Sequence, residues 1–136
     1  MAEIYPLHSF PVEKDIHILG TYIPLPFYGV LPANAYLITK PQSMLIDTGL
    51  AATSGDLLST VQRELDGGHL QWLWLTHVDP DHIGALRPLL AAYPGVKLVT
   101  TYLGLGKLGL HGIRIDNFFL STPVRFSTAR AVKCFV

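Results

Sequence analysis

The sequence has a single cysteine, no net charge and no long apolar run, and each lack excludes a class of protein. With only Cys134, the 136 residues exclude an intramolecular disulfide and a zinc site built from several cysteines. Ten basic residues balance ten acidic ones and are scattered, so neither nucleic acid nor a membrane surface is predicted as a partner. No apolar run approaches the roughly 20 residues of a membrane span, and the amino terminus lacks a signal-peptide pattern. We therefore expect a soluble, cytoplasmic protein.

Charged residues are also scarce, at 15% of the chain, whereas hydrophobic residues make up 49%. This balance excludes extended disorder, and the length suits one domain over residues 1–136. It also predicts either a sheet buried on both faces or an uncovered sheet face through which the chain self-associates. Because residues 133–136 form an apolar string like the start of a strand, we expect this domain to be truncated.

Short apolar runs alternate with helical patterns, which predicts an α/β fold. We expect strands over residues 15–20, 34–39, 43–47, 70–76 and 97–100. The run at 70–76 is nearly all apolar and therefore predicts a central strand covered on both faces. Residues 22–32 contain Pro24, Pro26 and Pro32, which cannot donate to a central ladder, so we expect a loop there.

Three helices are expected between these strands. The first begins near Thr53 or Ser54, either of which could cap it, and ends at Gly67 and the glycine after it. The second covers about residues 81–93 and contains Pro88, so we expect a break or kink inside it. The third, over residues 101–110, is weak because glycines interrupt it. Beyond residue 111 the apolar residues show no firm period.

Four side chains that can bind metal fall within six residues: His77, Asp79, Asp81 and His82. They follow the buried strand and precede the second helix, so they lie at the edge of the sheet where open α/β sheets bind ligands. Two imidazoles and two carboxylates suit zinc, iron or manganese. Residues 77, 79 and 81 can project together from an extended loop, and His82 can turn toward a second ion. The simpler alternative is that Asp81 caps the helix and that Asp79 starts a turn with Pro80.

Two motifs carry a resemblance to a known family. Residues 76–84, Thr-His-Val-Asp-Pro-Asp-His-Ile-Gly, are similar to the His-x-His-x-Asp-His signature of the metallo-β-lactamase superfamily. Residues 45–49, Leu-Ile-Asp-Thr-Gly, resemble the family's hydrophobic-Asp-Thr-Gly strand end, and order and spacing match over about residues 14–100. The resemblance implies an αββα fold of which this chain would be the first αβ half, a mixed sheet with helices packed on it.

The resemblance also implies a role for each residue. His77 and Asp79 would bind the first of two metal ions, and Asp81 and His82 the second. In hydrolytic members, the Asp81 position is also catalytic, because it orients or deprotonates the attacking water. Asp47 would fix the loop or a ligand histidine through hydrogen bonds. The alternative for Asp47 is a turn residue at the end of a strand.

Aspartate at position 79 departs from the pattern, because most family members have histidine there. An acidic residue at this place resembles the flavodiiron and oxygen-binding diiron branch, which uses glutamate. A carboxylate favours iron or manganese over zinc, so zinc, iron and manganese all stay open as the two divalent ions. The family's remaining ligands belong to a second half that this sequence lacks, so we expect an incomplete site. The one downstream histidine, His111, lies beside glycine and is interpreted as a turn residue.

Three hypotheses follow. The first is a metal-dependent hydrolase that acts on an unidentified small molecule through metal-activated water, inactive if truncation removed the other ligands. The second is a diiron protein that binds or reduces dioxygen or nitric oxide, and Asp79 is the residue that supports it. The third is a non-catalytic half-domain that associates with another chain.

Overall fold

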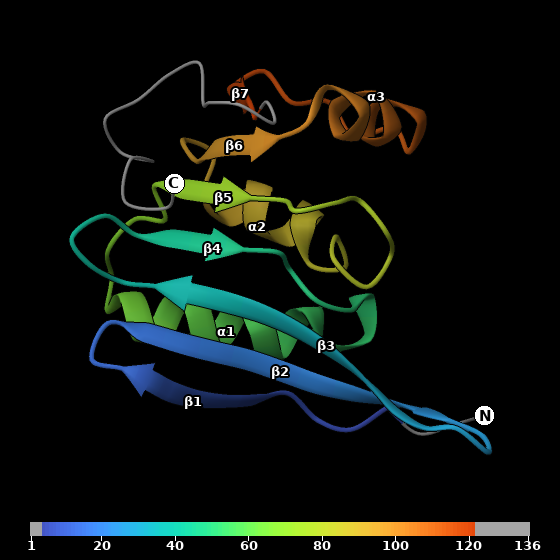
Figure 1. Ribbon diagram of the computed structural model, residues 1–136. Coiled ribbons are helices and arrows are strands. Elements are labelled where there is room, and N and C mark those ends of the chain that lie inside the picture. Colours follow the sequence, from blue (N-terminus) through green and yellow to red (C-terminus); the bar gives the residue numbers. More distant parts are fainter. Residues whose placement is uncertain (1–3, 122–136) are drawn as a thin grey trace.

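The computed structural model describes residues 4–121, so the expectations for Cys134 and for the apolar end lie outside the described residues. A mixed sheet of seven strands, ordered as in the sequence, forms the body of the fold (Figure 1). Strands one to four pair antiparallel, and strands four to seven pair parallel. The described strands are β1 (His8–Glu13), β2 (Ile16–Leu25), β3 (Gly29–Ile38), β4 (Met44–Ile46), β5 (Trp72–Trp74), β6 (Lys97–Thr100) and β7 (Phe118–Leu120).

Helices fill the connections between the parallel strands. They are the 3₁₀ helix η1 (Ala51–Thr53), α1 (Ser54–Leu65), α2 (Leu86–Ala92) and α3 (Tyr102–Leu110). In Figure 1, α1 lies behind β2 and β3, and α2 lies behind β5, so both cover the same face. The predicted α/β class, a mixed sheet with helices packed on it, is therefore confirmed. Within residues 4–121, no helix has the length and apolar character needed to cross a membrane.

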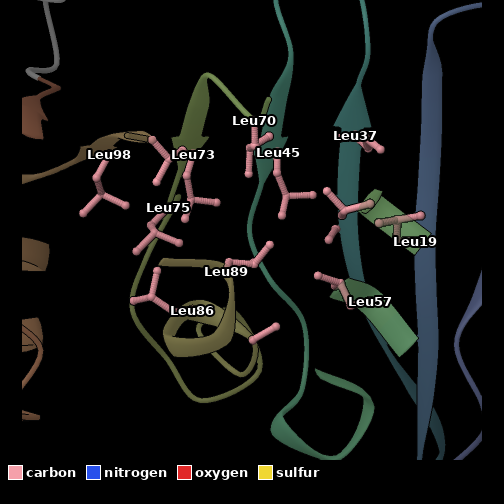
Figure 2. Packing of buried hydrophobic residues seen from close by; sticks show 14 of the residues in the cluster. Leu19, Leu37, Leu45, Leu57, Leu70, Leu73, Leu75, Leu86, Leu89 and Leu98 are labelled. Atoms are coloured by element: carbon pink, nitrogen blue, oxygen red, sulfur yellow. The ribbon is translucent and has the colours of Figure 1, made fainter. Parts of the chain in front are cut away.

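Leucines form most of the core between the sheet and the two helices that cover it. Figure 2 shows Leu37, Leu45 and Leu73 of the sheet gathered with Leu57 of α1 and Leu89 of α2. All five are completely buried. Burying one leucine is worth about 1.5–3 kcal/mol, so this layer holds α1 and α2 firmly on the sheet. The loops that lead from the strands into these helices are fixed as a result.

The opposite face of the parallel strands carries a smaller apolar cluster of Met44, Trp72 and Val99. Within β4 and β5, the next residues, Leu45 and Leu73, belong to the main core. Because successive strand residues point to opposite faces, these strands are apolar on both sides. The nearly all-apolar run at 70–76 therefore forms a central strand, as predicted, between β4 and β6.

The loop predicted over residues 22–32 is wrong, because β2 and β3 continue through this segment as a two-stranded arm. Pro24 and Pro32 both lie at paired positions of the arm. However, β1 pairs with β2 only up to Gly20, and β4 pairs with β3 only from Tyr36 onward. Along the arm, neither strand has a second partner strand among residues 4–121, apart from one bond from the Tyr5 N–H to the Tyr22 carbonyl at 3.2 Å. Such an edge tolerates a residue without an N–H group. The prolines therefore predicted a loop wrongly, because they lie on strand edges that need no hydrogen bond from them.

The second helix is shorter than predicted. Residues 80–82 form a turn, and α2 begins only at Leu86. Pro88 therefore lies in the first turn, where its missing N–H costs no hydrogen bond, and the predicted break is wrong. The first helix begins as predicted, but its N-cap residue Thr53 makes no capping hydrogen bond with its side chain. β7 forms at residues 118–120, where the apolar pattern predicted no element.

Candidate metal centre

Two loops meet at the carboxyl edge of the parallel strands. One is residues 47–49, directly after β4, and the other is residues 76–84, after β5. They start side by side because Ile46 pairs with Trp74 in parallel register. The Asp47 N–H continues this ladder by donating to the Trp74 carbonyl at 2.8 Å. The parallel register therefore brings the two sequence motifs, nearly thirty residues apart, to one place.

Backbone hydrogen bonds join the two loops. The N–H and hydroxyl of Thr48 both donate to the His82 carbonyl, at 2.8 and 2.9 Å. The same hydroxyl accepts the Ala85 N–H at 3.1 Å, and the Gly84 N–H donates to the Gly49 carbonyl at 2.8 Å. Thr48 is completely buried, so these bonds are shielded from water. Together they hold the backbone of His82 against the end of β4.

Gly84 makes this close approach possible. A Cβ atom at this position would lie 2.1 Å from the Ala51 nitrogen and 2.1 Å from the Leu50 carbonyl carbon. Both contacts are to backbone, which cannot rotate away, so no other residue fits without moving a loop. Gly49 supports the approach from the other side, with a φ of 65° that favours glycine.

Asp47 lies buried beneath the motif loop, with a φ of 61° in the left-handed region. One carboxylate oxygen accepts the Thr76 N–H at 2.9 Å, and the other accepts the Thr76 hydroxyl at 2.7 Å. Its Oδ2 also lies 2.9 Å from Nδ1 of His82, at ion-pair distance. That buried nitrogen forms no hydrogen bond, so the contact is close but not aligned. A carboxylate at Nδ1 leaves Nε2 as the free ring nitrogen, the arrangement common for metal-bound histidines.

The structure brings the candidate ligands together in the two predicted pairs. Nε2 of His77 lies 3.5 Å from Oδ2 of Asp79, and Nε2 of His82 lies 3.3 Å from Oδ2 of Asp81. Ligand atoms bound to one ion at 2.0–2.1 Å in tetrahedral geometry are roughly 3.4 Å apart, so either pair could hold an ion. The rings of His77 and His82 have their centroids 3.6 Å apart, which places the two pairs side by side.

The four residues differ in how closely they are grouped. Ligand atoms of His77, Asp81 and His82 all lie within 4.8 Å of one another, and Asp79 lies outside this group. The Asp79 side chain is also the most exposed of the four, at 60%, against 19% for His82. The Asp81–His82 pair is therefore the better enclosed half of the centre, and the donor types of both pairs fit a divalent ion.

The structure also tests the simpler interpretations of Asp81 as a helix cap, Asp79 as the start of a turn and His111 as a turn residue. Asp81 does not cap the helix, because the N-cap residue of α2 is Ala85. Asp79 does begin a turn, since its carbonyl accepts the His82 N–H at 2.9 Å. His111 ends α3, remains exposed and lies outside the cluster, in agreement with its prediction as a turn residue.

Two residues that position the centre, Thr48 and Thr76, were not predicted from the sequence. Thr48 joins the loops, and Thr76 supplies both donors that hold the Asp47 carboxylate. Each lies next to a residue already recognised as part of a motif. Thr48 is buried and its hydroxyl needs a partner, whereas Thr76 is exposed, so the position of both residues at strand ends was the available signal.

A family model described as the metallo-beta-lactamase superfamily matches residues 28–120, more than half of the chain and both motifs. The chain belongs to the metallo-β-lactamase superfamily. The resemblance noted in the sequence, to the amino-terminal part of this fold, is confirmed. The motif loop at 76–84 and the loop at 47–49 are thus the chain's two superfamily motifs, in contact.

Curated relatives of this superfamily domain are much longer proteins. Rubredoxin-oxygen oxidoreductase of Megalodesulfovibrio gigas is 33% identical over 78 residues, which are 57% of this chain and 19% of that protein. Anaerobic nitric oxide reductase flavorubredoxin of Pectobacterium atrosepticum is 30% identical over 78 residues, 57% of this chain and 15% of that protein. The chain therefore spans less than a fifth of the length of these relatives.

Solved structures agree on the fold. The flavodiiron core of Flv1 from Synechocystis superposes with a TM-score of 0.71 and 20% identity, covering 85% of this chain and 32% of that one. The metallo-β-lactamase DIM-1 superposes with a TM-score of 0.65 and 16% identity, covering 85% and 52%. The chain thus corresponds to about half of a β-lactamase domain of this superfamily.

Proposed function

We propose that residues 76–84 carry the amino-terminal ligands of a two-ion metal centre. The observation that carries this proposal is the pairing of each histidine Nε2 with an aspartate Oδ2 at 3.3–3.5 Å, on a loop braced against the end of β4. Two such pairs side by side present two imidazoles and two carboxylates to one space, and neither Lys nor Arg lies in the loop to compete for the carboxylates.

The residues of the centre have separate tasks in this proposal. His82 and Asp81 bind one ion, and Asp47 holds the His82 ring from behind through Nδ1. His77 and Asp79 bind the other ion at the exposed side of the loop. When bound, such ions would supply Lewis acidity for hydrolysis or, as ferrous iron, a site for dioxygen or nitric oxide, whose reduction would need an external electron donor.

Reduction or binding of dioxygen or nitric oxide at two irons is the reaction that we favour. Asp79 replaces the histidine found in most of the superfamily, and a carboxylate prefers iron to zinc. The curated relatives are named for oxygen and nitric oxide reduction, although the chain covers less than a fifth of them. Hydrolysis is the second candidate. It is supported by superfamily membership and by Asp81, placed 3.3 Å from a ligand nitrogen where it could orient water.

Either reaction needs ligands beyond these four residues. Catalytic zinc sites have about three protein ligands per ion, whereas this loop offers two. The further ligands would come from the second half of the superfamily fold, supplied by another segment or by a second chain. Self-association, by which a second chain would supply these ligands, is part of the proposal, as is a cytoplasmic location.

The test is the metal content of the purified chain after anaerobic loading with ferrous iron and, separately, with zinc. We expect close to one bound ion or more per chain, lost when His77 and His82 are both changed to alanine. His111→Ala is the matched control, because this exposed histidine lies outside the cluster, and it should keep the metal. Equal metal content in the control and the double variant would refute the proposal.

The two reactions are separated by spectroscopy and by hydrolysis. A diiron centre shows an absorption band that dioxygen changes, and this band should vanish in Asp79→Ala. A hydrolase loaded with zinc should instead cleave ester or lactam substrates and lose this activity in Asp81→Ala. An iron-loaded chain that binds two ions but does not respond to dioxygen would exclude the diiron reaction.

A further inference from the structure

A second site lies at the other edge of the sheet, where the parallel strands begin. There a pocket of about 770 Å³ is lined by Gln42 before β4, by residues 69–72 at the start of β5, by residues 92–97 between α2 and β6, and by Phe119 of β7. We call it the amino-edge pocket, and its principal side chains are Gln42, His69, Trp72, Tyr93, Lys97 and Phe119. Trp72 and Lys97 are the first residues of β5 and β6, whereas the metal loop follows the last residue of β5. In Figure 1 the arrowheads of β4, β5 and β6 point away from this edge.

The amino-edge pocket is lined by basic side chains and not by acidic ones, among the described residues. Among residues 4–121, its lining contains a lysine and a histidine but no aspartate or glutamate. The Lys97 ammonium lies 5.0 Å from the centre of the Trp72 ring, and within residues 4–121 no carboxylate lies within ion-pair distance of it. A cation held over an aromatic face without an acidic partner keeps its capacity to bind an anion.

The polar groups of the pocket are mostly donors. The acceptor oxygen of Gln42 already receives the Trp72 indole N–H at 3.0 Å. The acceptor oxygen of Gln71 already receives the Ser43 N–H at 3.0 Å. Burial raises the pKa of the Tyr93 hydroxyl above its ordinary value of 10.0, so this group is neutral at physiological pH and can donate. A ligand that brings its own acceptors therefore fits better than one that brings donors.

An accessible ring in the pocket is that of Phe119, which is partly exposed and packs on Trp72, itself only 3% exposed. The rings of Trp72 and Phe119 have their centroids 5.4 Å apart, at an angle of 48°. Aromatic walls favour flat rings, and pockets for small molecules have volumes of about 300–1,000 Å³. We propose that the amino-edge pocket binds a small aromatic anion, an aryl carboxylate or aryl phosphate, with its ring against Phe119, next to Trp72, and its charge at Lys97. The proposal is independent of the metal centre.

Trp72 provides the measurement, because the chain contains two tryptophans and Trp74→Phe leaves Trp72 alone. The full chain carrying this change is titrated with benzoate and with phenyl phosphate, followed by Trp72 fluorescence. Benzamide is the control that has the aromatic ring without the charge. Acetate and inorganic phosphate are the controls that have the anionic group without the ring. Calorimetry on the unchanged chain repeats each titration, so a folding defect of Trp74→Phe would not hide the result.

We expect saturable binding of one or both aryl anions and at least tenfold weaker binding of all three matched compounds. Whether benzoate or phenyl phosphate binds more tightly identifies the anionic group. Lys97→Met should weaken binding by about tenfold, the usual effect of losing one charge-assisted hydrogen bond, and Lys97→Arg should restore most of it. Lys107→Met, an exposed lysine on α3, is the matched control and should change nothing. Equal binding of benzamide and benzoate, unchanged binding in Lys97→Met, or no binding of either anion would each overturn the proposal.

Discussion

Replacing Gly84 by alanine tests the contact that joins the two motif loops. The added Cβ would lie 2.1 Å from the Ala51 nitrogen and from the Leu50 carbonyl carbon, and 2.5 Å from the Gly49 carbonyl oxygen. Gly84 is not among the glycines with positive φ, so its backbone conformation suits alanine and the effect comes from the clash alone. The loops must separate, which weakens the 2.8 Å hydrogen bond from the Gly84 N–H to the Gly49 carbonyl.

The expected loss of stability has two parts. Overpacking against rigid neighbours costs about 1–3 kcal/mol, and this site lies at the upper end because all three contacts are to backbone. The weakened hydrogen bond adds about 1 kcal/mol. We therefore expect the free energy of unfolding to fall by about 4 kcal/mol, which lowers the Tm by on the order of 10 °C for a domain of this size. Urea unfolding followed by circular dichroism measures the change.

Gly106→Ala is the matched control, because no atom of the described residues lies within 4 Å of its added Cβ and the residue lies inside α3. Alanine stabilises a helix interior by about 0.5–1 kcal/mol relative to glycine, so the same substitution should have the opposite sign there. If Gly84→Ala unfolds within about 0.5 kcal/mol of the unchanged chain, as neutral surface substitutions do, the two loops are not in rigid contact and the reasoning is refuted.

Three further predictions concern buried polar groups. Thr48→Val should cost about 2 kcal/mol in urea unfolding, because the Ala85 N–H loses its buried acceptor and the His82 carbonyl loses a donor, whereas Thr48→Ser should retain most of the stability. Asp47→Asn should weaken metal binding by about tenfold to a hundredfold in chelator competition, and unchanged affinity would contradict its role behind His82. Burial raises the pKa of Tyr93, so its contribution to stability is present below pH 10 and is lost as the pH rises through the folded-state pKa. The free energy of unfolding of Tyr93→Phe should therefore fall less over that alkaline range than that of the unchanged chain. Parallel pH profiles of the two proteins would contradict the raised pKa of Tyr93.

Much of the fold could be predicted from the sequence, because its signals are local. The all-apolar run before the metal loop predicted β5 at the centre of the sheet, where strands must be apolar on both faces. Glycine after α1 marked its end, and Asp66 and Gly67 indeed adopt left-handed conformations there. Where an outcome depended on distant neighbours, local signals failed. Pro24 and Pro32 suggested a loop, but they lie on an arm that neither β1 nor β4 reaches.

The chemical types of the metal centre were determined by the sequence alone. Two histidines and two aspartates within six residues, after a buried strand, require no knowledge of the rest of the chain. Only the tertiary structure decided how they are grouped and held, because Thr48, which joins the loop to the end of β4, lies 34 positions before His82 and 37 before Ala85. The parallel register of β4 and β5 brings that residue to the loop, and the same register separates the amino-edge pocket from the metal centre. The pairing of two strands depends on contacts across the whole sheet, so it cannot be predicted from one segment. Whether a residue can bind metal depends only on its own side chain.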